Sequence, residues 1–401
     1  MPEYIIDKTL DAEFDGLVCE GIGIPCPNGE IFFNPSSRLI DKQAALFGEA
    51  NLSLTPTLKL TAGARVSDVS YSGSFYLGGA FLGTPLITSS ASATEHPVTP
   101  KAVLTWQPGR DELLYASATK GYRVGGINTD VGAICGADLT TLGIPVGADG
   151  IRHVPTTYSS DSLWSYEIGA KNDFLDRRLE VNTSLYWIDW SNIQQNVYLP
   201  SCGNEFVANL GTVRSRGGDI ELRYRPSEPL VLSVSASYTK AAYTEASCAG
   251  ALGYNGTDCV GSPGGTPVAV APIVSAGDAL LGAPWRFVSS IDYSLPKWGA
   301  TAPYFHADYV YTSAQTALLP GQDTRNALYD TTIPSLPITS DLDLRTGLRW
   351  SGFDLSLFAQ NVTNSHPILY ESRDVPYTYD DLYFAHTWRP RTIGMTGIYR
   401  F

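Results

Sequence analysis

The sequence predicts an all-β protein, a transmembrane antiparallel β-barrel, and three observations support this fold class. Apolar and polar residues alternate with a period of two along many segments, which is the pattern of strands with two different faces. The connections between these segments are alternately short and long, as in bacterial outer-membrane barrels. Charged residues make up only 17% and aromatic residues 11% of the 401 residues, which suits a surface lying partly against lipid.

The alternation is regular enough to place about 13–14 strands, each near the roughly 9–11 residues that cross a bilayer at a tilt. In one segment Leu230, Leu232 and Val234 alternate with serines. The expected strands are, in order, Gln43–Leu54, Leu58–Ser67, Thr99–Trp106, Leu113–Arg123, Tyr158–Phe174, Arg178–Val197, Asp219–Arg225, Leu230–Tyr238, Arg286–Leu295, Tyr304–Thr312, Asp341–Arg345, Phe353–Asn361 and Thr392–Phe401.

The lengths of the connections indicate which strand ends lie at the same rim of the barrel. Turn-forming residues supply the short ones, at 55–56, 108–110, 175–177, 226–229, 296–300 and 351–352. The long ones are rich in Gly, Pro, Asp and Thr and cover 125–157, 245–283, 317–337 and 364–390. Loops of this length are uncommon in a compact soluble domain. They are expected at one rim of the barrel, with the short turns at the other.

Composition and pattern exclude other classes of protein. No stretch approaches the roughly 18 apolar residues that a membrane-spanning helix requires. The net charge of −13 has the wrong sign for coating nucleic acid, so we expect no nucleic-acid partner. A secreted β-sandwich binding protein is an alternative, but the sequence shows no repeated modules or linkers, and charges of both signs follow one whole face of the strands.

Several motifs, in their order and spacing over 39–401, resemble the TonB-dependent outer-membrane receptors. The segments that carry the resemblance are 42–50 with 60–65, 113–128, 165–171, 209–221, 359–364 and 390–394, followed by the terminal Phe401. The resemblance implies an uptake receptor for a scarce ligand, and iron chelates are the commonest ligands of the family. It also implies a Gram-negative outer-membrane location and no enzymatic activity.

The resemblance further implies that part of the family's architecture is missing. Receptors of this family are barrels of about 22 strands with an N-terminal plug domain. Neither a plug, an energy-coupling box nor a secretion signal is visible, so we expect residues 39–401 to be the C-terminal portion of such a barrel and residues 1–38 to be the remnant of an extracellular loop. A genuine smaller barrel of about fourteen strands is the alternative.

The last expected strand has a distinct pattern. Ile393, Met395, Tyr399 and Phe401 share one parity, which predicts that they face lipid with an aromatic pair at the interface. A C-terminal aromatic strand also resembles the signal by which the barrel assembly machinery recognises outer-membrane proteins. Tyr399 and Phe401 are therefore expected to form the assembly signal.

The six cysteines fall in expected loops. Proximity in sequence suggests the pairs Cys19–Cys26 and Cys248–Cys259, which leaves Cys135 with Cys202, although fifteen pairings are possible. Surface disulfides suit a location outside the reducing cytosol. Zinc binding is disfavoured because no CxxC spacing or Cys–His cluster is present.

No catalytic site and no cofactor or metal site is expected. The five histidines are scattered, without an HExxH helix or a nucleophile elbow. A ligand site near the outer rim would combine aromatic and polar side chains. The candidates are Tyr122, Arg123, Asn128, Tyr158, Trp164, Tyr198 and Tyr311, for most of which a place in the interface girdle is the simpler interpretation.

The sequence therefore predicts an outer-membrane uptake receptor, for ferric siderophores or a similar ligand. Its expected partners are outer-membrane lipid, the barrel assembly machinery, a small-molecule ligand such as a ferric chelate and, through the missing N-terminal region, the TonB–ExbB–ExbD system. A passive porin-like channel is the first alternative. An outer-membrane enzyme would require a nucleophile and a base that the sequence does not show.

Overall fold

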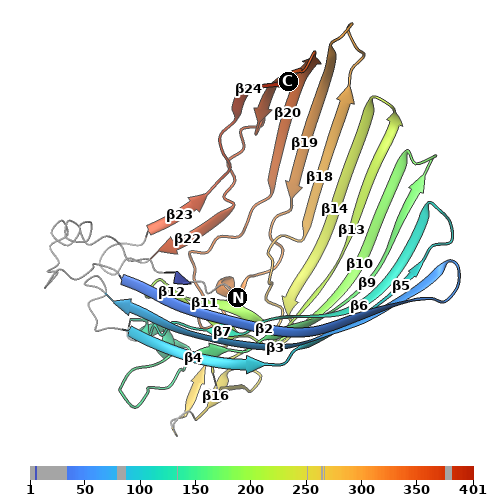
Figure 1. Ribbon diagram of the computed structural model, residues 1–401. Coiled ribbons are helices and arrows are strands. Elements are labelled where there is room, and N and C mark those ends of the chain that lie inside the picture. Colours follow the sequence, from blue (N-terminus) through green and yellow to red (C-terminus); the bar gives the residue numbers. More distant parts are fainter. Residues whose placement is uncertain are drawn as a thin grey trace.

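The fold is one large antiparallel sheet that carries a set of structured loops at one end (Figure 1). The computed structural model describes residues 5–6, 34–78, 87–132, 134–250, 252–262, 265, 267–374 and 382–401. Every strand of the large sheet pairs with a neighbour close to it along the chain, so the sheet is an up-and-down meander. In order across the sheet, its strands are β1 (Ile5–Ile6), β2 (Asn34–Ser53), β3 (Leu58–Gly78), β5 (Val98–Trp106), β6 (Glu112–Arg123), β9 (Asp161–Phe174), β10 (Leu179–Ser191), β13 (Thr212–Ser227), β14 (Leu230–Tyr243), β18 (Trp285–Ser294), β19 (Ala302–Thr312), β20 (Thr339–Trp350), β21 (Phe353–Gln360) and β24 (Thr392–Tyr399), while β4 (Ile87–Glu95) pairs with the outer half of β3.

The sheet is a curved wall (Figure 1). Its path runs from β1 to β24, and these two strands do not pair with each other in the described part of the chain. The thirteen long strands from β2 to β24 correspond one for one to the thirteen segments expected from the alternation. No helix among the described residues is long and apolar enough to cross a membrane.

The register gives the wall one apolar and one polar face. Residues paired across antiparallel strands point to the same side of a sheet. Leu232 pairs with Tyr224 in one neighbouring strand and with Ile291 in the other. Ile291 pairs in turn with Ala307, and Ala307 pairs with Leu344, so these residues all lie on one face. The alternate positions are polar, such as Ser233, Ser290, Asp308 and Asp343. We call these the apolar face and the polar face.

The last strand follows the expected parity. Ile393, Met395, Tyr399 and Phe401 are exposed, and Tyr399 stacks obliquely with Phe353 at 4.5 Å and with Phe401 at 6.3 Å between ring centroids. Met395 pairs with Leu357 and thereby belongs to the apolar face. The C-terminal end of the chain therefore carries an aromatic group on this face.

The short turns and long loops lie at opposite ends of the wall (Figure 1). The long loops contain regular elements, several of which pair into small sheets of their own. Their elements are β7 (Gly126–Ile127) with β8 (Thr157–Tyr158), α2 (Gly136–Thr141), β11 (Gln194–Leu199) with β12 (Asn204–Asn209), β15 (Gly253–Tyr254) with β16 (Cys259–Gly261) and β17 (Val268–Val270), η4 (Pro320–Gln322), and β22 (Tyr370–Asp374) with β23 (Leu382–His386).

Three expected boundaries differ from the structure. The segment 178–197 is not one strand, because β10 ends at Ser191 and Asn192 takes a positive φ of 57°, after which β11 pairs with β12 instead of with the wall. The segment 158–174 is likewise divided between β8 and β9. At the start, β2 begins at Asn34, ahead of the expected barrel boundary at Leu39.

Candidate functional site

The buried core of the protein lies in the loops, at one end of the wall. The loop residues 124–160, 192–211, 244–284 and 313–338, as far as they are described, form a compact unit that we call the cap. Its apolar cluster joins loop residues to the wall strands β13 and β14 at the ends next to the loops, through Val213 at the start of β13 and Tyr243 at the end of β14. The fully buried members include Leu139, Leu142, Ile193, Leu199 and Val274. A thin sheet has no interior of its own, so the hydrophobic core holds the loops to the rim.

Two disulfides fasten the cap. Cys135 at the start of α2 is joined to Cys202 after β11, and Cys248 is joined to Cys259. Cys248–Cys259 is one of the two pairs suggested by proximity, and Cys135–Cys202 is the pair that this choice left over; Cys259 lies in the short strand β16. Cys19 and Cys26 lie outside the described residues. The first bond ties together two loops that are 67 residues apart in sequence.

Arg123 connects the wall to the cap. Its guanidinium group forms a salt bridge with the buried Asp161 opposite it in β9 and donates a hydrogen bond to the carbonyl oxygen of Gln194 at 2.8 Å. The same group lies 4.7 Å from the ring centroid of Trp190. The Asp161 carboxylate also accepts a hydrogen bond from the backbone N–H of Gln194 at 3.0 Å. This arrangement fixes the bend where the chain leaves β10 for β11.

Asn128 joins two loops of the cap through its side-chain amide. It is buried, its Nδ2 donates to the carbonyl oxygens of Pro155 (2.8 Å) and Val207 (2.9 Å), and its Oδ1 accepts from the backbone N–H of Val207 (2.8 Å). Both donors and the acceptor are therefore used within the protein. This candidate ligand residue has a structural role in the cap.

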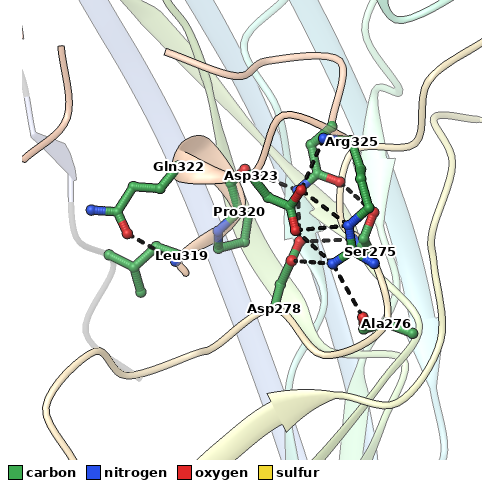
Figure 2. Close-up of polar contacts among 9 residues, drawn as sticks. Ser275, Ala276, Asp278, Leu319, Pro320, Gln322, Asp323 and Arg325 are labelled. Carbon is green, nitrogen blue, oxygen red and sulfur yellow. Dashed lines mark hydrogen bonds and ion pairs between the residues drawn. The ribbon is translucent and has the colours of Figure 1, made fainter. Parts of the chain in front are cut away.

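A second polar cluster, formed by Ser275, Asp278, Asp323, Arg325 and Asn326, links the loop after β14 to the loop after β19 (Figure 2). The guanidinium group of Arg325 binds Asp323 with Nε–O distances of 2.9 and 3.0 Å and reaches Asp278 at 3.3 Å. Asp278 accepts from Asn326 Nδ2 at 2.6 Å and from the backbone N–H of Ser275 at 2.8 Å. Both carboxylates are buried, whereas the Arg325 side chain is 57% exposed.

The two carboxyl groups of this cluster have opposite pKa shifts. Burial raises the pKa of Asp278, and a hydrogen bond shared with Asp323 adds to the increase. The hydrogen bonds from Arg325 lower the pKa of Asp323. Two carboxyl groups in contact favour the state in which one holds the proton. The contact between the two carboxyl groups therefore separates their pKa values, beneath a solvent-exposed guanidinium group.

One aromatic side chain lies near the exposed guanidinium group. Tyr254 is close enough to contribute to the raised pKa of Arg325, whose first cause is the hydrogen bond that Arg325 donates to Asp323. Tyr254 is 45% exposed, and Tyr329, in the same loop as Arg325, is 40% exposed. An exposed donor group with an aromatic ring nearby can bind an organic ligand with oxygen acceptors. Sequence reasoning missed these residues because Arg325 gains its aromatic neighbour only when two distant loops meet.

The seven expected ligand residues do not form one site. Trp164 and Tyr311 belong to the apolar face, where Trp164 stacks on Tyr166 at 6.0 Å. Tyr122 accepts a hydrogen bond from Gln43 at 2.7 Å. Tyr158 packs over Gly126, at a position where a Cβ atom would collide with its ring, and Tyr198 lies exposed on β11. Asn128, Tyr158 and Tyr198 belong to the cap, whereas Tyr122, Arg123 and Tyr311 lie within the last two residues of their strands, at the rim.

No group of three or more His, Cys, Asp or Glu side chains that could hold a metal ion is found among the residues that the structure describes.

Residues 15–365 match the family described as TonB dependent receptor-like, beta-barrel. The chain belongs to this family. Its members are receptors and transporters of the Gram-negative outer membrane and are not enzymes. The end of the wall with the long loops and the cap is thus the extracellular end, and the end with the short turns is the periplasmic end.

Solved structures share the fold of this receptor chain. The ferric yersiniabactin uptake receptor FyuA from Yersinia pestis superposes with a TM-score of 0.64 at 12% identity, over 92% of this chain and 47% of FyuA. The siderophore receptor PiuA from Acinetobacter baumannii gives 0.58 at 14% identity, over 92% and 43%. The copper transporter OprC gives 0.59 at 11% identity, over 90% and 49%. The chain thus spans about half the length of these proteins. No curated protein matches it in sequence.

Proposed function

We propose that this chain forms part of the wall and the extracellular cap of an outer-membrane receptor that takes up a scarce small-molecule ligand, such as a ferric siderophore. The observation that carries the proposal is the cap itself. A cross-linked core holds polar and aromatic groups in place at the extracellular rim, as a ligand-binding surface requires. A passive pore needs only a polar lumen.

The two faces of the wall support the partners expected from the sequence. The apolar face suits contact with outer-membrane lipid, and the polar face suits a water-filled or plugged lumen. The aromatic group at Tyr399 and Phe401 suits recognition by the barrel assembly machinery. Membership of the receptor family supports TonB–ExbB–ExbD as the partner that supplies energy.

An organic chelate suits the chemistry of the cap. Within the proposal, Arg325 donates hydrogen bonds to oxygen atoms of the chelate, while Tyr254 and Tyr329 contact its rings. Similarity to receptors described as siderophore receptors supports this ligand class, and the copper transporter among the similar structures makes a metal ion the competing ligand.

The proposal is tested by uptake in a strain that lacks its ferric-chelate receptors. The full receptor containing this chain is expressed there, and accumulation of radiolabelled ferric chelates and of copper is measured with and without an uncoupler of the proton gradient. We expect gradient-dependent accumulation of a chelate, weakened in a Tyr254→Ala/Tyr329→Ala variant. Trp298→Ala, an 83% exposed aromatic residue at the opposite rim, is the matched control. Accumulation that is independent of the gradient would indicate a passive channel instead.

A further inference from the structure

Basic side chains gather on the apolar face, at the extracellular ends of its strands. Arg216 in β13 pairs with Lys240 in β14 on one side and with Trp187 in β10 on the other. Two residues nearer the rim, Arg214 pairs with Asp189, and Lys120 lies on the same face opposite Trp164. We call Lys120, Arg214, Arg216 and Lys240 the basic patch.

The basic patch carries uncompensated positive charge. Asp189 accepts a hydrogen bond from Arg214 at 2.8 Å and thereby neutralises this one member, whose guanidinium group also lies over the Trp187 ring at 4.8 Å. Arg216 and Lys240 are exposed and form no ion pair with any residue that the structure describes. Four cations and one carboxylate give the patch a net charge of 4 − 1 = +3, in a chain whose net charge is −13.

Like charges directly opposite each other on one face of a sheet are destabilising. Arg216 and Lys240 form such a pair, and the face that they occupy is otherwise apolar. An anion between them would remove the repulsion. A guanidinium group binds the oxygens of a phosphate with paired, charge-assisted hydrogen bonds, and an ammonium group adds a point charge.

An apolar groove adjoins the basic patch. The groove has a volume of about 680 Å³ and includes Arg216 in its lining; on the apolar face its walls are Leu185, Ile220, Ala236, Tyr238 and Trp285. Gly218 forms part of the floor, and a Cβ atom there would lie 2.6 Å from Leu185 Cδ2, so a side chain at this position would fill the groove. The rings of Tyr238 and Trp285 are 4.7 Å apart.

The basic patch and the apolar groove follow one another along the wall as the phosphate and the acyl chain do in a phosphorylated lipid. Tyr166, Trp187, Tyr238 and Trp285 lie on the same face, at or next to the level of Arg216, and aromatic residues of this kind mark the level of the lipid headgroups. Apolar side chains continue the face toward the periplasmic end, as an acyl chain requires.

We propose that the groove and the basic patch together bind one phosphorylated lipid of the outer leaflet, with its phosphate between Arg216 and Lys240 and an acyl chain along the groove over Gly218. This site lies on the outer surface of the wall and is separate from the ligand site proposed in the cap. It is a fixed lipid position, which the uptake function does not require.

The test is lipid retention by the full receptor purified in a non-ionic detergent. The receptor is stripped of lipid, titrated with diphosphorylated lipid A in detergent micelles, and the bound lipid is counted by native mass spectrometry. The variant Arg216→Gln/Lys240→Gln removes the two cations that lie directly opposite each other. Arg286→Gln is the matched control, because Arg286 is exposed at the same end of the wall but on the polar face. Heat-modifiable migration in gels shows that each variant is folded.

We expect the double variant to bind the lipid about 30-fold more weakly, given the usual effect of two basic residues at an anionic surface, and Arg286→Gln to bind as the wild type does. Ala236→Trp, which fills the groove without changing its charge, should also weaken binding. Equal binding by the wild type and the double variant would overturn the proposal. So would equal loss in the Arg286→Gln control, equal binding of dephosphorylated lipid A, or full competition by inorganic phosphate alone.

Discussion

The disulfide between Cys135 and Cys202 should decide whether the cap stays closed. Replacing both cysteines with alanine opens a link that spans 67 residues. The loop-closure relation gives a stabilisation of about 4 kcal/mol for a loop of this length, in a model that assigns the effect to the entropy of the open state. Both cysteines are buried in the apolar cluster, so alanine, which adds no polar group, is the appropriate replacement.

Hydrogen exchange measures this effect locally. A loss of about 4 kcal/mol should speed opening of the cap by about three orders of magnitude. The amides to follow are those of Leu139 and Ile144 in the cap, with the amides of β18 in the wall as the internal control. The matched variant lacks Cys248–Cys259, which spans only 11 residues and should stabilise its loop by about 3 kcal/mol.

Two outcomes would refute this reasoning. Unchanged exchange in the cap would show that the apolar cluster alone holds the loops. Faster exchange throughout β18 would show that the cap and the wall unfold as one unit, against the separate core described above.

Three further predictions concern other parts of the molecule. Leu232→Arg on the apolar face should cost about 2–4 kcal/mol near the bilayer midplane, whereas Ser233→Arg on the polar face should be tolerated; equal damage in a folding assay would contradict the assigned faces. Burial raises the pKa of Asp278, so the closed cap binds the proton of this carboxyl group more tightly than the open cap does. The closed cap should therefore lose stability as pH rises through the raised pKa. Proteolysis of the cap as a function of pH should show this loss in the wild type and not in Asp278→Asn. Asn128→Ala leaves the backbone N–H of Val207 without its hydrogen-bond acceptor and should destabilise the contact between these two loops by about 1–3 kcal/mol. Hydrogen exchange of the Val207 amide as slow as in the wild type would contradict this role of Asn128.

The wall could be predicted from the sequence because its strands and turns are determined by residues that are close together along the chain. The alternation at Leu230, Leu232 and Val234 assigns faces directly, and a one-residue shift would reverse every side chain. Short turns then fix which strands are neighbours. The same reasoning failed at Asn192, where a positive φ turns the chain out of the wall although the expected strand continues to Val197.

The cap could not be predicted in the same way because its contacts are between distant loops. Asn128 binds Val207, and Arg325 binds Asp278, across 79 and 47 positions of sequence. Nothing near these residues in sequence indicates their partners. Aromatic residues such as Trp164 and Tyr311 looked like ligand contacts, but their parity places them on the apolar face. The ligand site depends on folded geometry, whereas the fold class depends on periodicity.

The membrane orientation of the wall and the proposed lipid site both depend on which face of the wall meets lipid, and spin labels at two adjacent positions measure this directly. Single cysteines introduced at Leu344 and Asp343 are labelled with a nitroxide in the full receptor in bilayers, and collision rates with oxygen and with a water-soluble nickel chelate are compared. A label at position 344 should collide mainly with oxygen, which concentrates in lipid, and a label at 343 should be less accessible to oxygen and more accessible to the chelate. The reverse order, or equal exposure of both labels to the chelate, would contradict the assignment of the apolar face to lipid.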